Sequence, residues 1–251
     1  MPDLDWLTSR PIAHRGYHDA SRGVVENSPS AIKAAVDHNF AIEVDLQETA
    51  DQTAIVFHDN AFDRLTTASG PVRTHSLSRI KSIDMRGSND PIWSLEDLLD
   101  EVAGKVGLCI EIKSQFRNDS EPFVKSICSA VQSYRGPVAL KSFDPEILAL
   151  LRHHAPNIPR GALADGIRNL NNWGRFSMME RFILRHMLHW PRTRPSFVSY
   201  GINDLPAVGP FLAQKIAGLP VVTWTVRTIK QREIAAKWAD QMVFEGFNPD
   251  K

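Results

Sequence analysis

The sequence has only two cysteines, no net charge and no long apolar run. No segment approaches the roughly 20 apolar residues that a membrane-spanning helix needs. The N-terminus, Met1–Trp6, carries acids without an apolar stretch, which argues against a signal peptide. Cys109 and Cys128 lack metal-ligand or redox spacing, so we expect buried free thiols in a reducing compartment. A formal net charge of zero gives no field that favours nucleic acid or an anionic membrane. Together these features predict a cytoplasmic protein.

The bulk composition is that of an ordinary globular protein. The 251 residues are enough for one large α/β domain or two small ones. The apolar fraction of 43% supplies a packed core, and the charged fraction of 23% is usual for a folded chain. Composition therefore limits the size of the fold and leaves its chemistry open.

Short apolar runs alternate with amphipathic segments along most of the chain. We expect strands at 11–13, 41–46, 54–57, 107–113, 138–143, 160–164, 197–201, 221–226 and 242–244. Helices are expected after Ser28-Pro29 and Ser94, and at 120–134, 145–154, 206–217 and 228–239. Such alternation predicts a parallel sheet, and a closed TIM-type (β/α)8 barrel typically needs ~250 residues. The alternative is an open doubly wound sheet, but no glycine-rich phosphate loop follows the first run. We therefore predict an α/β barrel as a single domain over 1–251.

Two segments depart from this rhythm. The short connection at Asp51-Gln52 predicts a hairpin. Residues 60–93, rich in Ser, Thr and Arg, then predict a small insertion over one face of the barrel. Residues 168–194 carry six arginines against one glutamate, with large apolar residues between them. The plain interpretation of 168–194 is a barrel helix with its apolar face inward, and the alternative is a surface for lipid headgroups, an anionic substrate or a partner subunit.

Three carboxylates lie at predicted strand ends. Glu43 and Asp45 are two apart on one strand, so they share a face roughly 7 Å apart, and Glu111 has the same setting on a later strand. Clustered carboxylates repel one another unless a cation neutralises them, and hard oxygen ligands suit Mg²⁺ or Ca²⁺ better than zinc. The alternative pairs each acid with Arg15, Lys113 or Lys141 in structural salt bridges.

Two histidines, His14 and His58, follow apolar runs and could act as an acid and base pair near neutral pH. Arg15 offers a planar fork of donors suited to phosphate oxygens, and Lys113 offers a point charge. A metal ion, two imidazoles and two cations together fit attack at an anionic phosphorus centre. The second imidazole is needed to protonate the leaving alkoxide of a diester.

The ordered set of these motifs resembles the glycerophosphodiester phosphodiesterase family. The resemblance runs through His14-Arg15-Gly16, Glu26-Asn27-Ser28, Ile42-Glu43-Val44-Asp45, Thr49-Ala50-Asp51, Val56-Phe57-His58-Asp59, Arg64-Leu65-Thr66, Glu111-Ile112-Lys113, Ser142-Phe143 and Trp224-Thr225. It covers residues 11 to 226. Any one motif is weak, but their order along the chain is highly specific.

The resemblance implies a TIM-barrel phosphodiesterase of glycerol and lipid metabolism, which splits glycerophosphodiesters into glycerol 3-phosphate and an alcohol. It implies metal binding by Glu43, Asp45 and Glu111, acid–base catalysis by His14 and His58, and phosphate contacts from Arg15 and Lys113. It also implies that the substrate's own neighbouring hydroxyl attacks first, and that water then opens a cyclic phosphate. Asn27-Ser28 also fits a turn and a helix cap, which we favour over a catalytic role.

Three departures from the family pattern concern the substrate more than the core reaction. Glu245 stands in an unusual last strand, where it could reach the barrel mouth or merely end the strand. Lys141, before Ser142-Phe143, is a weak further candidate for phosphate binding. The chain ends at Lys251 without a final barrel helix, so the N-terminal segment or another subunit could cover that place.

Two other functions stay open at this point. One is a lysophospholipase D-like activity on single-chain phospholipids, with residues 168–194 holding the acyl tail. The other is a non-catalytic binder of glycerol phosphates, which the paired histidines argue against. The expected partners are a small-molecule substrate and, peripherally, lipid or a second copy in a homo-oligomer.

Overall fold

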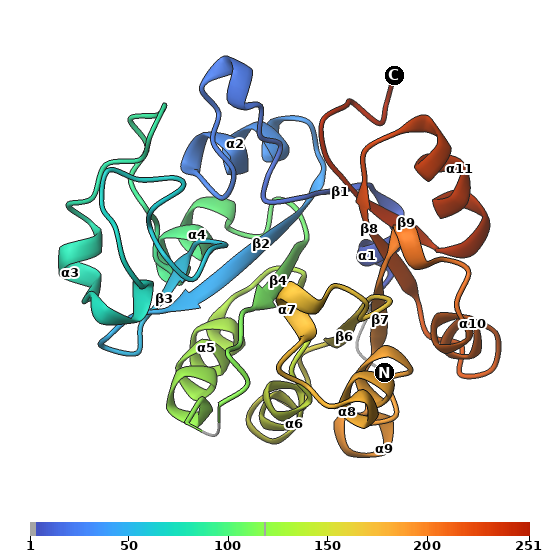
Figure 1. The fold of residues 1–251 in the computed structure, drawn as a ribbon. Coiled ribbons are helices and arrows are strands. Elements are labelled where there is room, and N and C mark those ends of the chain that lie inside the picture. The colour runs from blue at the N-terminus through green and yellow to red at the C-terminus, as the bar shows by residue number, and fades with distance from the viewer. Residues whose placement is uncertain (1–3, 118) are drawn as a thin grey trace.

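The computed structural model describes residues 4–117 and 119–251, and eight parallel strands form its closed barrel (Figure 1). The strands are β1 (Ile12–Ala13), β2 (Ala41–Glu48), β4 (Leu108–Ile112), β5 (Val138–Ser142), β6 (Arg160–Ala164), β7 (Phe197–Gly201), β8 (Val221–Val226) and β9 (Gln241–Phe244). They follow the order β1-β9-β8-β7-β6-β5-β4-β2, and pairing of β1 with β2 closes the ring. The predicted TIM-type barrel is therefore confirmed.

Helices surround the strands, as the amphipathic segments predict. The longer ones are α2 (Pro29–Asp37), α4 (Leu95–Val102), α5 (Glu121–Ser133), α6 (Pro145–His154), α10 (Val208–Lys215) and α11 (Ile229–Trp238). The side chains of Ser28 and Ser94 cap α2 and α4 by accepting hydrogen bonds from backbone N–H groups, and Pro29 occupies the first position of α2. Both helix starts lie where the sequence places them.

Alternation along β2 separates the core from the chemistry. Ile42, Val44 and Leu46 point outward into the main apolar core beneath the helices, where burial of each stabilises the fold by about 1.5–3 kcal/mol. Glu43 and Asp45 take the opposite, inward face, because successive residues of a strand alternate. The closed ring thus places these two acids in the interior of the barrel.

The short helix α1 (Asp5–Ser9) closes the N-terminal end of the barrel. Leu7 is fully buried and packs in one cluster with Ile12, Cys109 and Phe197 from the barrel interior. Cys109 and Cys128 are buried free thiols, as expected, and burial raises the pKa of Cys109 to about 12. With this end closed, the carboxyl ends of the strands face the open end, where TIM barrels carry their chemistry.

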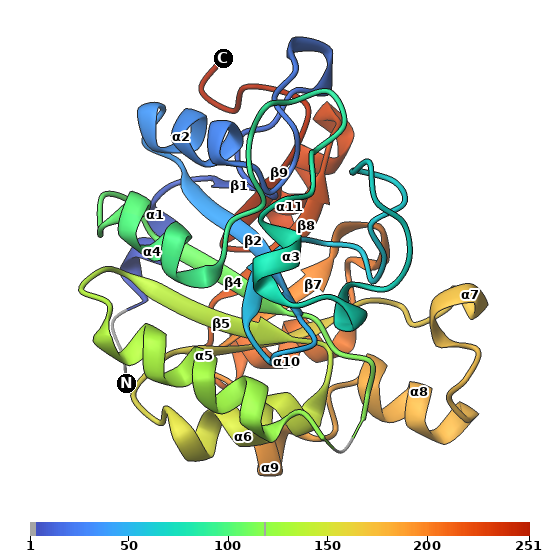
Figure 2. The ribbon, with the colours of Figure 1, turned by 90° about the vertical axis from the view of Figure 1, so that its left-hand side faces the viewer.

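A side excursion follows β2. β3 (Ala54–Val56) pairs antiparallel with β2, which is the predicted hairpin. The next stretch contains the 3₁₀ turn η2 (Val72–Thr74) and α3 (Leu77–Ile80); it lies at the left of the barrel in Figure 1 and in front of it in Figure 2. It has a small apolar cluster of its own that includes Phe57, Phe62 and Ile80.

Residues 168–194 do not form the single barrel helix of the plain interpretation. They form α7 (Leu170–Trp173), α8 (Met178–Arg185) and α9 (Trp190–Thr193), and in Figure 2 α7 and α8 extend from the body of the fold. Ser177 starts α8 anew with a capping box, and Met187 has a positive φ of 54°, so the helix cannot continue. Met178 and Phe182 are 79% and 52% exposed, whereas Leu184 and Met187 are buried, so only part of the expected inward face is covered.

Two 3₁₀ turns complete the described elements: η1 (Ala20–Arg22) follows β1, and η3 (Ile202–Asp204) follows β7. Among the described residues, no helix combines the length and the apolar character needed to cross a lipid bilayer.

Candidate active site

One cavity of about 1000 Å³ lies at the carboxyl ends of the strands. It is lined by all eight side chains that the sequence nominates for catalysis, phosphate binding or metal binding: His14, Arg15, Glu43, Asp45, His58, Glu111, Lys113 and Lys141. These residues come from β2, β4, β5 and the loops that follow β1, β3 and β4. The fold therefore brings all of them to one place, and their chemical roles stay predictions.

The three carboxylates meet because of strand register. Asp45 of β2 lies beside Glu111 of β4, and Glu43 lies one inward position deeper on β2. One oxygen from each carboxylate lies within 4.8 Å of the others, and all three side chains are buried. Three convergent oxygen donors fit Mg²⁺ or Ca²⁺. The donor set therefore fits the divalent cation that the sequence predicts.

Each of these carboxylates also has a cationic neighbour, which is the alternative that the sequence left open. Lys113 Nζ lies 2.8 Å from Asp45 Oδ1 and 2.6 Å from Glu111 Oε1. Lys141 Nζ lies 2.9 Å from Glu43 Oε1, and Arg15 Nε lies 3.3 Å from Asp45 Oδ2. Burial alone would raise the pKa of Asp45, but Lys113 and the other nearby cationic groups hold that pKa well below its ordinary value. A divalent ion at this position would compete with these cations for the same oxygens.

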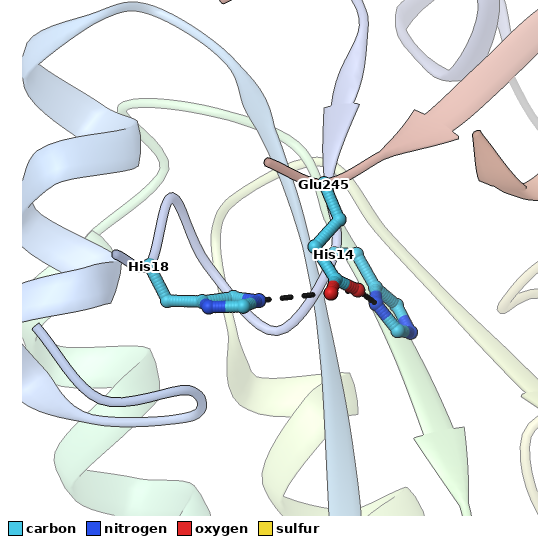
Figure 3. Close-up of side chains that lie close together, drawn as sticks. All are labelled: His14, His18 and Glu245. Atoms are coloured by element: carbon cyan, nitrogen blue, oxygen red, sulfur yellow. Dashed lines mark hydrogen bonds and ion pairs between the residues drawn. The ribbon is translucent and has the colours of Figure 1, made fainter. Parts of the chain in front are cut away.

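His14 is fixed by a carboxylate from the far end of the chain. Its Nδ1 lies 2.7 Å from Oε2 of Glu245, which follows β9, the neighbour of β1 (Figure 3). Its Nε2 lies 4.0 Å from Glu43 Oε2. The hydrogen bond with His14 is the largest cause that lowers the pKa of Glu245, to about 2, and Arg227 adds to it at 3.0 Å. Glu245 therefore reaches the barrel mouth, which the sequence left undecided.

His58 has a similar arrangement. Its Nδ1 lies 2.7 Å from Asp59 Oδ1, and Arg64 Nε donates to the other oxygen of Asp59 at 2.6 Å. Arg64 also donates to Glu26, which in turn accepts a hydrogen bond of 2.7 Å from Arg15. This chain of charged hydrogen bonds links the two imidazole-bearing loops and orients His58 toward the cavity.

Asn27 does more than form a turn. Its side-chain N–H donates to Asp45 Oδ2 at 2.9 Å, and its side-chain oxygen accepts from the Asp45 backbone N–H at 3.3 Å. Ser28 is the helix cap that we expected, but Asn27 also holds a predicted metal ligand. Its positive φ of 58° permits both contacts, because asparagine tolerates this conformation better than most residues.

Aromatic side chains line one part of the cavity wall. Phe143 contacts Trp173 and Trp224 in edge-to-face geometry, with ring centroids 5.3 and 5.7 Å apart. Phe116 contacts Trp173 in the same manner. The Arg175 guanidinium lies 4.9 Å from the centre of the Phe116 ring. The cavity therefore has a charged floor and an aromatic side.

Comparison with known proteins agrees with this geometry. Residues 14–251 match the model of the glycerophosphoryl diester phosphodiesterase family. The chain belongs to this family. A glycerophosphodiester phosphodiesterase of Bacillus subtilis is 30% identical over 179 residues, which is 61% of this chain and 59% of that protein. The YhdW protein of the same bacterium is 35% identical over 140 residues, which is 49% of this chain and 56% of that protein. This member of the family thus spans less than two thirds of the length of both relatives.

The fold of this family member is also that of solved structures. A phosphodiesterase of Oleispira antarctica, solved in complex with its product sn-glycerol-3-phosphate, superposes with a TM-score of 0.75. The two chains are 19% identical, and the match covers 93% of this chain and 91% of that one. This likeness shows the common barrel.

Sequence reasoning missed the residues that hold the site together. Asp59, Arg64, Glu26 and Asn27 belong to motifs that carry the resemblance, but their partners lie up to 38 residues away along the chain. Local spacing cannot predict such contacts, whereas an acid directly after a strand-end histidine could have pointed to Asp59.

Proposed function

We propose that this protein is a metal-dependent phosphodiesterase that hydrolyses glycerophosphodiesters to glycerol 3-phosphate and an alcohol. The observation that supports this most is the pair of histidines in one cavity, each with Nδ1 on a carboxylate and next to three buried acids. A non-catalytic binder of glycerol phosphate needs charge and shape, but it has no use for two oriented imidazoles. The reaction class therefore follows from the histidines and the substrate class from the family.

In this proposal His14 and His58 transfer protons to and from the reacting groups of the substrate. A carboxylate that accepts from Nδ1–H leaves the lone pair of Nε2 free to take a proton, as in other oriented His–carboxylate pairs. One imidazole accepts the proton of the attacking hydroxyl or water, and the other donates a proton to the leaving alkoxide. Either histidine could act first as the base.

The cationic side chains bind the phosphate. Arg15 and Lys113 line the cavity, and their side chains are 17% and 18% exposed. Charge-assisted hydrogen bonds to phosphate oxygens are short and strong, and the Arg15 fork suits two of them. Lys141 is the weakest of the three candidates, because its side chain is only 2% exposed and its ammonium group contacts Glu43.

Glu43, Asp45 and Glu111 hold a divalent cation, Mg²⁺ or Ca²⁺. When bound, the cation offsets the negative charge on the non-bridging phosphate oxygens. Asn27 and the backbone N–H of Arg15, which donates to Glu43 at 3.1 Å, keep two of these carboxylates in place.

The test combines a substrate panel with chelation. We expect hydrolysis of glycerophosphocholine or glycerophosphoethanolamine, loss of this activity in excess chelator, and recovery with Mg²⁺ or Ca²⁺. A variant with His14→Ala and His58→Ala measures the background. Full activity in excess chelator would contradict the metal role. If the folded, metal-loaded protein hydrolyses no glycerophosphodiester of the panel, the proposed function is wrong.

A second candidate, lysophospholipase D-like activity, is favoured by a smaller pocket of about 310 Å³ beside the main cavity. Its walls include Phe176, Ile183 and Leu184, and it shares Phe116 with the main cavity. The exposed apolar side chains of α8 continue this surface outward. A single acyl chain could lie there while its phosphate occupies the main cavity, and α8 would then meet lipid peripherally.

Comparing lysophosphatidylcholine with glycerophosphocholine separates the two candidates. If the acyl chain lies in the smaller pocket, Phe176→Ala lowers kcat/KM for lysophosphatidylcholine and leaves glycerophosphocholine unchanged. Equal effects on both substrates, or no activity on the lipid, would contradict the lysophospholipase D-like function.

A homo-oligomer stays a prediction, which light scattering can check.

A further inference from the structure

A cluster of two imidazoles and one carboxylate lies beside the carboxylate site and shares His14 with the catalytic pair. The loop after β1 carries His14 and His18, and Glu245 follows β9, which pairs with β1. In Figure 3 the Glu245 carboxylate lies between the two rings. Its Oε2 is 2.7 Å from His14 Nδ1 and 4.0 Å from His18 Nε2, and all three donor atoms lie within 4.8 Å of one another.

His18 has no role in the mechanism above, and its Nε2 atom takes part in none of the contacts described for that mechanism. This nitrogen is buried and has no hydrogen-bond partner among the described residues. Buried polar atoms in folded proteins are nearly always satisfied, so an orphaned ring nitrogen that faces a carboxylate indicates a missing partner. Burial is the largest cause that lowers the pKa of His18, which favours a neutral ring with a lone pair available.

We propose that His14 Nδ1, His18 Nε2 and Glu245 form a second metal site, which takes a transition-metal cation of the zinc class. Two imidazoles and one carboxylate are a known donor set for Zn²⁺, whereas Mg²⁺ and Ca²⁺ prefer oxygen alone. Tetrahedral ligands at about 2.0–2.2 Å from zinc lie about 3.3–3.6 Å from one another. Small side-chain rotations open the 2.7 Å contact and shorten the 4.0 Å contact toward this value.

Arg227 opposes this site, because its guanidinium donates to the same oxygen of Glu245 at 3.0 Å. Its side chain is 52% exposed, so it can move to the other carboxylate oxygen or into solvent. Arg227 therefore weakens the affinity for the cation without excluding it. Its removal is expected to strengthen binding.

The site provides a means of inhibition. A metal ion on Nδ1 of a neutral imidazole leaves the ring proton on Nε2, so that His14 can no longer accept a proton from the attacking group. Zinc bound here therefore blocks the base form of His14. This consequence rests on the proposed function, whereas the binding of zinc does not.

The experiment measures Zn²⁺ and Mg²⁺ binding to the full chain by calorimetry, with Mg²⁺ in excess during the zinc titrations. The variants are His18→Gln, Arg227→Gln and Glu111→Gln, and thermal unfolding checks that each is folded. His153→Gln is the matched control, since His153 is an exposed histidine next to His154 on α6. Loss of one ligand of a three-ligand site should weaken zinc binding about tenfold or more.

We expect one zinc site that His18→Gln weakens, Arg227→Gln strengthens, and Glu111→Gln and His153→Gln leave unchanged. Zinc should inhibit hydrolysis by the unmodified protein and inhibit His18→Gln far less, with equal activity of the two in the absence of zinc. Zinc binding that survives His18→Gln but is lost in Glu111→Gln would place the ion on the carboxylates and overturn the proposal. So would the absence of zinc binding. If zinc binds as expected but no diester is hydrolysed, the site stands and the proposed function fails.

Discussion

Lys141 and Glu43 form an ion pair in the barrel interior, with Nζ 2.9 Å from Oε1 and side chains that are 2% and 1% exposed. The same ammonium lies 4.0 Å from Glu111 Oε2, because Lys141 pairs in register with Glu111 on the neighbouring strand. Burial lowers the pKa of a lysine, but here Glu43 outweighs that cost and keeps Lys141 charged. The chain thus carries a fixed cation among its predicted metal ligands.

Lys141→Met should therefore raise the affinity for Mg²⁺. Two unit charges at 4 Å interact by about 4 kcal/mol at an effective dielectric constant of 20, and part of this repulsion is relieved when the ammonium moves. A gain of about tenfold, or about 1.4 kcal/mol, is expected in calorimetry. Lys105→Met, at an exposed lysine in the turn after α4, is the control. Unchanged or weaker Mg²⁺ binding would show that Lys141 does not compete with the ion.

Glu43→Gln should have the opposite effect on the same titration. The amide keeps the shape of the side chain but removes the charge that attracts the cation, so Mg²⁺ affinity should fall by about tenfold or more. Glu96→Gln, an exposed acid in α4, should leave binding unchanged. Unchanged Mg²⁺ binding in the Glu43 variant would show that the ion binds elsewhere and that Glu43 is not one of its ligands.

His14→Ala and His58→Ala should each lower turnover by roughly 10²- to 10⁴-fold, because each removes a proton-transfer group. The fold should persist, which circular dichroism and thermal unfolding can verify. His153→Ala, on the surface of α6, should retain full activity. Near-normal turnover in both active-site variants refutes the acid–base assignment.

Glu245→Gln tests the orientation of His14. The amide can present its NH₂ group to Nδ1 and so stabilise the other tautomer, which turns Nε2 into a donor. We expect kcat to fall on the order of 10²–10⁴-fold with little change in KM. Glu245→Asp should restore part of the rate, since it keeps the charge. A change confined to KM would indicate that Glu245 acts on substrate binding.

The same residue predicts a pH dependence of stability. The pKa of Glu245 is about 2 in the folded protein, below its ordinary value of 4.5, chiefly through the hydrogen bond with His14. A depressed pKa means that the carboxylate stabilises the folded state above pH 4.5, and that this contribution is lost as the pH falls toward 2. Urea unfolding should therefore find the unmodified protein more stable than Glu245→Gln at pH 5–6, with the difference vanishing near pH 2. A constant difference over this range would contradict the prediction.

Much of the barrel could be predicted from local pattern. Alternation in β2 separates Ile42, Val44 and Leu46 from Glu43 and Asp45, and parallel strands bring their carboxyl ends together. The helices after Ser28 and Ser94 begin where their capping residues stand. The prediction of a single barrel helix over residues 168–194 was wrong, because apolar periodicity indicates a helix but does not show whether another element covers its apolar face.

The sequence by itself determined which side chains point into the barrel and that they gather at one end, because strand parity and strand direction are local properties of the chain. Only the tertiary structure decided their partners. His14 meets Glu245 across 231 residues, and closure of the ring between β1 and β9 makes that contact. Whether a buried acid pairs with a lysine, an imidazole or a metal ion depends on such contacts, since electrostatic energies depend on distances that no local pattern contains.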